Sequence, residues 1–472
     1  MFPFKNMVTL SPSLKLQLDS INLNHRDRND RFRAIFNTLI STNPCLSFPK
    51  IFKDSYQLKA LYRLINNKHV KQEKIINSYQ TGLIEYSLSQ DSKQAWYLIH
   101  DTMLVEFNSR QVDLGYTQTL KSNGFLLHHG LLLDGDYTPL GLLHQEVIFR
   151  ERENFGKRVL HRTKTIEDKE SNKWLEGLKI AAYFKDKTER PLINVMDREG
   201  DIGDVINKCI ELGQCFVIRS RHNRSTLSLE AKWKTKNLAA YSLYNMLQNN
   251  TPSQVIKHTL RNKKGQQYEA LCNLRYASFE FRGINGTINC VHLQEIEPNN
   301  SDDQPVEWFI LSNMPIASEN DALIFIEIYS KRWSIEEFHK CYKTGCSIEE
   351  RQFDSRTALT NIIALLAIVA VELLRNRFYA KTNPNMPLEE VIPNKDERVL
   401  IKKLAEIHLK PIDLTLCKED TMLWWIILLG RMGGHQGIKN KGLPGWQTIW
   451  AGYNYYTQIL NGYMLGRKDF MG

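Results

Sequence analysis

Five polar or charged side chains recur at helical spacing between residues 328 and 345, IYSKRWSIEEFHKCYKTG. At about 100° per residue they share an arc of roughly 80° on one helix. They are Tyr329, Arg332, Glu336, Lys340 and Lys343. An ordinary surface helix mixes charges to form i,i+4 pairs, and a solvated salt-bridge face is the plain alternative. A single carboxylate among two lysines, an arginine and a tyrosine instead favours a strongly anionic ligand beside a metal ion.

Two aspartates upstream occupy strand-like segments. Asp101 lies midway along WYLIHDTM, and Asp197 ends the short apolar run of NVMDREGD. Taken alone, Asp101 could be a buried aspartate satisfied by backbone groups. Asp197 could be the strand-end acid of some other α/β enzyme. Only together with Glu336 do the two aspartates indicate a catalytic site.

The segment around Glu336 resembles the Tyr-Arg-Glu-Lys signature of bacterial insertion-sequence DDE transposases. The signature is Tyr, two residues, Arg, three residues, Glu, six residues and Lys, and Tyr329, Arg332, Glu336 and Lys343 have these spacings. The family's Asp-Thr and Asp-Arg-Glu-x-Asp motifs match 101–102 and 197–201. Further similar segments run from LYRLINN near the N-terminus to GWQTIWAGY near the C-terminus, so the resemblance covers nearly the whole chain.

The resemblance implies that Asp101, Asp197 and Glu336 are catalytic and hold two Mg²⁺ ions, with Mn²⁺ as a substitute. Two such ions about 3.5–4 Å apart can bind the attacking and leaving oxygens of a phosphodiester. Mg²⁺ prefers hard carboxylate oxygens and keeps several waters. Asp101 would bridge both ions, while Asp197 and Glu336 would each complete the coordination of one.

The resemblance also assigns DNA contacts. Tyr329, Arg332, Lys340, Lys343 and Arg219 would bind phosphates at the cut end, which positions DNA without reading its sequence. The resemblance associates Trp308 and Trp333 with a base flipped out of the stack, where stacking repays part of the cost of flipping. A core aromatic is the alternative role for each tryptophan.

The activity implied is cut-and-paste transposition through a hairpin intermediate, with joining of the 3′-hydroxyl ends to target DNA. The partners implied are double-stranded transposon ends, target DNA and a second copy of the chain. Two alternatives remain open. One is a ribonuclease H-like nuclease without strand transfer, and the other is an inactive DNA-binding transposition inhibitor.

Charge and composition agree with a polyanionic partner. The chain has 472 residues and a formal net charge of +10. Residues 1–80 carry 13 Lys and Arg against 5 Asp and Glu, a net charge of +8. Such an excess is typical of nucleic-acid binding without proving it. Candidate DNA contacts in this region are Arg26, Arg28, Arg31 and Arg33, for which a solvated charged face is the alternative.

No targeting signal or metal-binding cysteine pattern is apparent. The eight cysteines include no Cys-x-x-Cys pair, and scattered cysteines are typical of a reducing compartment. The longest apolar run, 362–371, indicates a buried helix too short to span a membrane. We therefore expect a bacterial cytoplasmic protein with no membrane partner.

The order of elements predicts an α/β fold, a mixed sheet flanked by helices, and the resemblance implies that this sheet belongs to a ribonuclease H-like core. Three strands in hairpin succession are followed by helix, strand, helix and strand. A β-rich insertion is expected at about 221–305 and one long helix at about 319–344. The predicted domains are a helical domain at 1–85, the catalytic domain at 86–375, and a helical domain at 376–472. The resemblance implies that the first of them binds DNA and that the last supports dimerisation.

Overall fold

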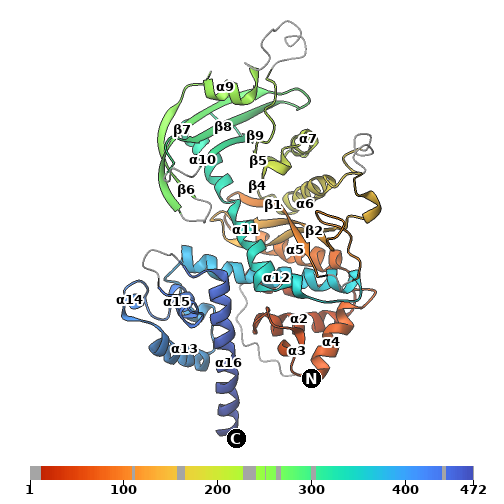
Figure 1. Ribbon diagram of the computed structural model, residues 1–472, viewed down its shortest axis with the longest axis vertical. Coiled ribbons are helices and arrows are strands. Elements are labelled where there is room, and N and C mark those ends of the chain that lie inside the picture. The colour runs from red at the N-terminus through yellow and green to blue at the C-terminus, as the bar shows by residue number, and fades with distance from the viewer. Residues whose placement is uncertain are drawn as a thin grey trace. The chain divides into compact units, whose positions relative to one another are not determined.

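The computed structural model describes residues 12–108, 112–156, 165–226, 241–249, 251–261, 267–298, 304–437 and 443–470. Parts of the predicted insertion lie outside these residues. The chain forms two compact units (Figure 1). Unit 1 comprises Met1–Ser92, Thr102–Lys157 and Ile335–Gly472, and unit 2 comprises Lys93–Asp101 and Arg158–Ser334. The chain passes between the units within one strand and again within the first turn of one helix.

Unit 2 is a mixed sheet with helices. Its strand order is β1-β4-β5-β9-β8-β7-β6. β1 pairs with β4, and β4 with β5, in parallel. The other four pairs, β5 with β9, β9 with β8, β8 with β7 and β7 with β6, are antiparallel. The strands are β1 (Trp96–Glu106, of which the first part lies in unit 2), β4 (Leu192–Met196), β5 (Cys215–Arg219), β6 (Gln254–Arg261), β7 (Gln267–Glu280), β8 (Thr287–Glu295) and β9 (Glu307–Ser312).

The helices of unit 2 bury apolar faces against this sheet. Trp174 and Leu178 of α6, Val205 and Ile206 of α7, and Phe216 of β5 belong to one hydrophobic cluster. Burial of such side chains is the main favourable term in folding. The helices are α6 (Asn172–Thr188), α7 (Gly203–Glu211), α9 (Leu243–Asn249) and α10 (Glu319–Ser330), and the short η3 (Arg198–Gly200) follows β4.

Unit 1 joins the remaining strands to helices from both ends of the chain. The second part of β1 continues the order β3-β2-β1, and β2 pairs with β3 antiparallel. These strands are β2 (Gly124–Leu133) and β3 (Pro139–Ile148). The N-terminal helices are α1 (Pro12–Asp19), α2 (Arg26–Ile40), α3 (Phe48–Ile51), α4 (Ser55–Ile65) and α5 (Gln72–Leu88). The later helices are α11 (Trp333–Lys340, from Ile335 onward), α12 (Arg356–Thr382), α13 (Lys395–His408), α14 (Pro411–Leu414), α15 (Met422–Met432) and α16 (Trp446–Phe470).

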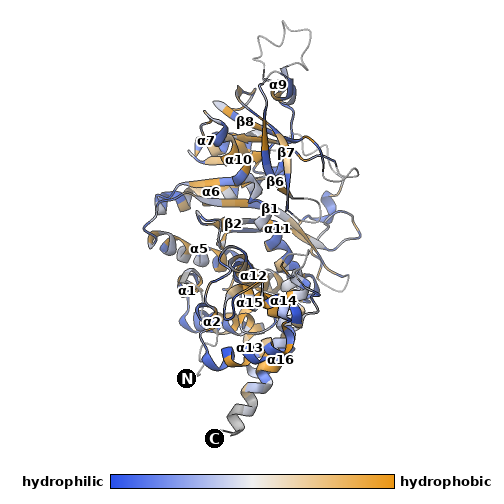
Figure 2. Ribbon diagram, turned by 90° about the vertical axis from the view of Figure 1, so that its left-hand side faces the viewer, coloured by the Kyte–Doolittle hydropathy of each residue, from blue (hydrophilic) through white to orange (hydrophobic). Residues whose placement is uncertain are grey.

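Helix α12 forms the centre of unit 1. It contacts α5, β3 and α15, and its apolar residues can be followed by colour in Figure 2. The buried helix expected around 362–371 is confirmed, but the expected length was too short. By length and composition α12 could cross a membrane, yet 83% of its most apolar stretch is buried inside the protein. Such burial is typical of a core helix.

The mixed sheet and its flanking helices agree with the predicted α/β class. The predicted succession of three strands, helix, strand, helix and strand is confirmed as β1, β2, β3, α6, β4, α7 and β5. The single long helix predicted for about 319–344 is wrong. The chain instead forms α10, a turn at Lys331 and Arg332, α11, and a π-helical turn, η5 (Cys341–Gly345).

Candidate active site

The two predicted catalytic aspartates occupy neighbouring positions on parallel strands of unit 2. The register of β1 and β4 ends at His100 opposite Met196. Asp101 is the next residue of β1, and Asp197 is the residue directly after the end of β4. Adjacent strands lie about 4.8 Å apart, and successive side chains alternate between faces. His100 and Met196 are buried, and the His100 ring lies 6.3 Å from the Trp174 ring of α6. The two aspartates therefore share the face opposite α6.

The Asp197 carboxylate is held by the local backbone. Asp197 has an extended conformation and caps the short helix η3, accepting a hydrogen bond of 2.8 Å from the Glu199 amide. A short polar side chain at such a cap satisfies an amide that the helix leaves free. One carboxylate oxygen is thus oriented by the turn that follows β4.

Asp101 is paired with a cation from the signature segment. Arg332 Nη1 lies 3.6 Å from Asp101 Oδ2, and both side chains are less than one-fifth exposed. Arg332 occupies the turn between α10 and α11, so it does not share one continuous helix face with Tyr329 and Glu336. The turn forms because the amides of Lys331, Arg332 and Ser334 bond to carbonyls three residues back, a pattern that tightens the last turn of a helix.

Arg219 ends β5 with an incompletely satisfied guanidinium. Its Nη2 donates to the Glu307 carbonyl at 2.9 Å. Its Nε is buried and has no acceptor among the described residues. Burial lowers the pKa of Arg219, the neighbouring Tyr329 opposes this shift, and the charges of Arg198 and Arg332 lower the pKa further. Arginines close enough to repel one another, with a donor to spare, suit an anion such as phosphate.

Aromatic side chains extend this cluster. The rings of Trp308, on β9, and Tyr329, on α10, lie 5.2 Å apart at 74°. Arg332 Cζ lies 6.0 Å from the Tyr329 ring. Tyr329 is buried, whereas Trp308 is half-buried and does not belong to the hydrophobic cluster of unit 2. Trp333 opens α11 directly after Arg332. Unit 2 thus brings Asp101, Asp197, Arg219, Trp308, Tyr329 and Arg332 into one region.

The remaining signature residues belong to unit 1. Glu336 is half-buried on α11, whose Ile335 and Phe338 are buried as expected. Lys340 lies 3.2 Å from Glu337, and Lys343, in the π-helical turn, lies 2.9 Å from Glu349. Within the described ranges, no three Asp, Glu, His or Cys side chains gather closely enough to hold a metal ion. The donor set of Asp101 and Asp197 nevertheless fits Mg²⁺, which binds one or two carboxylates together with waters and substrate phosphates.

The N-terminal arginines divide into two kinds. Arg28 donates to the Leu23 carbonyl at 2.7 Å, and Arg33 donates to the carbonyls of Leu18 and Asp19 at 3.0 and 2.9 Å. These two help to close the connection between α1 and α2. Arg26 has an exposed side chain 3.8 Å from Asp30, and Arg31 is half-buried on α2. A role of any of the four in DNA binding stays a prediction.

Asp201 is a residue whose importance the sequence did not reveal. It closes the Asp-Arg-Glu-x-Asp motif but is fully buried, unlike the half-buried Asp197. Its carboxylate pairs with Arg224 at 2.6 Å and accepts hydrogen bonds from Ser220, Arg221 and His222. The motif shows two aspartates four residues apart, and no feature of the sequence tells which one faces inward.

Residues 164–371 match a family model described as "Transposase DDE domain". The match includes Asp197, Arg219, Trp308 and the whole signature segment, and it begins after Asp101. It supports a DDE transposase family, and with it a nuclease or transposase enzyme that acts on DNA. Enzymes of this family are generally dependent on divalent metal ions.

Proposed function

We propose that this protein is a bacterial cut-and-paste transposase that cleaves DNA at transposon ends and joins these ends to target DNA. The observation that carries the proposal is the pair Asp101 and Asp197 on adjacent parallel strands, with Arg332 paired to Asp101 and Arg219 close by. Two carboxylates beside converging arginines suit a phosphodiester that gains negative charge during substitution.

In this proposal Asp101, Asp197 and Glu336 hold two Mg²⁺ ions, and Mn²⁺ can replace them. When bound, the ions supply Lewis acidity to the attacking and leaving oxygens. Glu336 follows Arg332 by four residues in the signature segment, which supports a role for both at the same phosphate. Arg332 balances the charge of Asp101 and binds a phosphate oxygen when DNA is present. Arg219 donates its free Nε–H, and Tyr329 its hydroxyl, to the same strand.

Four substitutions at phosphorus complete the proposed reaction. Water displaces the flanking DNA and frees a 3′-hydroxyl, and this hydroxyl attacks the opposite strand to form a hairpin. A second water opens the hairpin, and the 3′-hydroxyl then attacks the target strand. Each substitution forms one phosphorus–oxygen bond and breaks another. Trp308 would stack on a base flipped out at the hairpin, because a half-buried aromatic ring beside phosphate-binding groups suits a base.

Cleavage of cognate ends by the purified protein tests the proposal. Inverted repeats in the DNA that flanks the coding region would supply the substrate. We expect cleavage with Mg²⁺ or Mn²⁺, and loss of cleavage in Asp101→Asn, Asp197→Asn and Glu336→Gln while end binding persists. Asp204→Asn, an exposed acid on α7, is the matched control and should cleave normally. Cleavage at the wild-type rate by any of the three variants would contradict the assignment.

The two alternatives give different products. Pre-cut ends mixed with a plasmid should yield insertions if the protein transfers strands, whereas a nuclease would only nick the plasmid. An inactive inhibitor would bind ends and cleave nothing. We further propose that two copies of the chain pair two ends before cleavage, in the bacterial cytoplasm. A complex holding two labelled ends and two chains should then form before any product appears.

A further inference from the structure

Asp201 is a buried charge with three hydrogen-bond donors at one carboxylate oxygen and an ion-paired arginine, without a hydrogen bond among the described residues, at the other. Its side chain is fully buried in unit 2. One carboxylate oxygen accepts from the Arg221 and His222 amides at 2.6 and 3.0 Å and from the Ser220 hydroxyl at 3.3 Å. The other oxygen lies 2.6 Å from Arg224 Nη1. A buried carboxylate persists only when paired and hydrogen-bonded in this way.

These contacts join the segments after two adjacent strands. Asp201 belongs to the segment after β4, four residues from Asp197. Its donors belong to the turn after β5, which begins one residue beyond Arg219. The Ser220 amide also bonds to the Phe309 carbonyl of β9 at 2.7 Å. The turn is therefore tied on one side to the Asp197 segment and on the other to the strand that carries Trp308.

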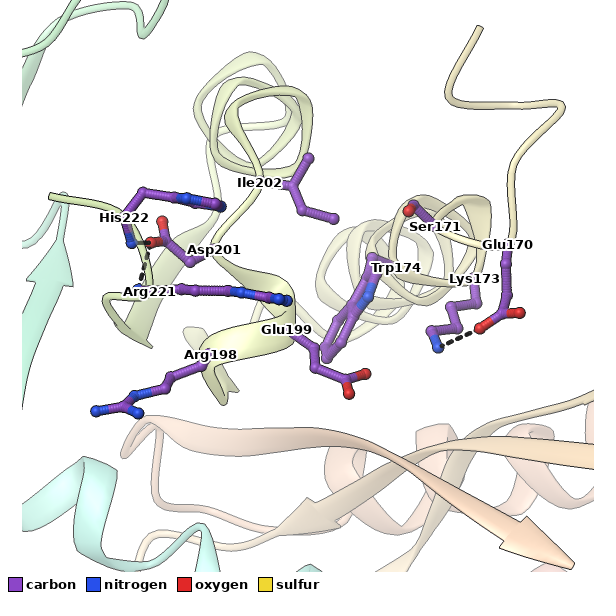
Figure 3. A pocket seen from close by; sticks show the side chains of 10 residues that line it. All are labelled: Glu170, Ser171, Lys173, Trp174, Arg198, Glu199, Asp201, Ile202, Arg221 and His222. Atoms are coloured by element: carbon purple, nitrogen blue, oxygen red, sulfur yellow. Dashed lines mark hydrogen bonds and ion pairs between the residues drawn. The ribbon is translucent and has the colours of Figure 1, made fainter. Parts of the chain in front are cut away.

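The turn directs its arginines to different places. Arg219 lies beside Tyr329, which partly offsets the lowering of the Arg219 pKa by burial. Arg221 extends toward Trp174, into a cavity of about 180 Å³ that Arg219 does not line (Figure 3). Asp201 accepts from the amide of Arg221 in the same view, so a displaced carboxylate would release the backbone between the two arginines. Arg224 also donates to the Asp201 carbonyl at 3.2 Å, so it contacts both the side chain and the backbone of Asp201.

We infer that Asp201 is a positioning residue that holds Arg219 at the DNA phosphate, in register with Asp197. The inference rests on the proposed function, because it takes a phosphate as the ligand of Arg219. Asp201 itself touches no substrate. Its negative charge faces four donors at once, so the neutral amide of Asn would place an N–H₂ group against N–H donors and loosen the turn.

A double-mutant cycle separates positioning from general stability. Residues that act through one another show non-additive effects, whereas independent ones add. We expect Asp201→Asn and Arg219→Ala each to slow single-turnover end cleavage, on the order of 10²-fold. The double variant should be only about 3-fold slower than Arg219→Ala. Losses that multiply, or normal cleavage by Asp201→Asn, would overturn the inference.

A binding measurement decides the matter without chemistry. The affinity for a pre-cut end falls with salt, with a logarithmic slope of about 0.9 per phosphate contacted. Arg219→Ala and Asp201→Asn should each reduce the slope by about one contact, and the double variant by no more than either. Additive reductions would overturn the inference. If the wild type binds ends but never cleaves, the proposed function fails while this slope still tests Asp201.

Two further variants guard against a folding defect. Arg224→Lys keeps the buried charge but loses the forked contact, so it should lose less cleavage activity than Asp201→Asn does. When Arg219 is already replaced by Ala, Arg224→Lys should cause no further loss. Asp204→Asn, the exposed acid three residues along, should change neither rate nor slope. An Arg224→Lys loss that persists in full in the Arg219→Ala background would count against a positioning role.

Discussion

The Asp101 carboxylate and the Arg332 guanidinium lie 3.6 Å apart, although one side chain comes from β1 and the other from the turn between α10 and α11. Each is less than one-fifth exposed, so the pair is only weakly screened by solvent. Arg332 can balance the charge of Asp101 before DNA binds and can turn to a phosphate afterwards. This pair links the signature segment to the sheet that carries both aspartates.

Arg332 should matter more for cleavage than for binding. We expect Arg332→Ala to slow single-turnover cleavage on the order of 10²-fold, because charge that develops in the transition state loses a donor. Binding of the uncut end should weaken only a few-fold, since many other phosphates are contacted. Arg332→Lys should recover part of the rate without the forked geometry. Equal losses in binding and cleavage would argue that Arg332 only anchors DNA.

Trp308 should act at the hairpin step. Loss of one base–aromatic stack costs about 1–3 kcal/mol, so Trp308→Ala should slow hairpin formation while first-strand nicking continues. Trp308→Phe should retain much of the rate because an aromatic face remains. A 2-aminopurine base near the end reports flipping through its fluorescence, and the rise on binding should disappear in Trp308→Ala. An unchanged fluorescence rise would show that Trp308 is only a structural contact of Tyr329.

His129 should make the protein sensitive to acid. It is fully buried on β2, with its Nδ1 3.1 Å from His339 Nε2 on α11, the helix that also carries Glu336. Burial lowers its pKa from 6.5 to about 3, opposed by Gln145 and reinforced by His144. The unfolded chain therefore binds a proton that the folded chain does not. Stability from neutral His129 is full above about pH 6.5 and falls, by up to about 1.4 kcal/mol per pH unit, down to about pH 3.

Chemical denaturation between pH 4 and 7 checks this prediction. His129→Leu should flatten the loss of stability below pH 6.5, because the residue that titrates only in the unfolded chain is gone. His69→Gln, at an exposed position, should leave the pH profile unchanged. Identical profiles for His129→Leu and the wild type would mean that another group governs acid sensitivity.

Arg375 should be essential to the stability of unit 1. It is almost fully buried on α12, pairs with Glu372 at 2.6 Å, and donates to the carbonyls of Pro139 and Leu140. Removing one partner of a buried pair costs about 3–5 kcal/mol. Arg375→Met should lower the unfolding free energy by that order, and Arg375→Met with Glu372→Met should recover part of it. A variant as stable as the wild type would contradict the interior position of α12.

The sequence predicted the sheet better than it predicted the signature segment. Strand-like runs bounded by turn residues identified β1 to β5, because period-two patterns and turn residues are local signals. The break at Lys331 and Arg332 has no such signal, since the segment SKRWS contains neither glycine nor proline. The turn arises from backbone bonds of i to i−3 type and a distant partner, Asp101.

Site residues were predictable where a motif fixed them and not where burial decided. Asp101 and Asp197 follow from their motifs, and β-strand register then places them side by side. Nothing local shows that Asp201 faces four donors, since these come from residues 220 to 224. Likewise, nothing in the arginine cluster of α2 shows that Arg28 and Arg33 bond to backbone carbonyls. Contacts between distant segments carry that information.

The central claim is that these carboxylates bind the metal ions of the cleavage reaction, and a change of metal preference tests it most directly. Asp197→Cys replaces a hard oxygen ligand with a soft thiolate. We predict that this variant binds ends, fails to cleave them with Mg²⁺, and regains cleavage with Mn²⁺. The ratio of the Mn²⁺ rate to the Mg²⁺ rate should be at least about 10-fold higher for the variant than for the wild type. Asp204→Cys should show no such change of preference. Cleavage by Asp197→Cys with Mg²⁺ at the wild-type rate would contradict the account.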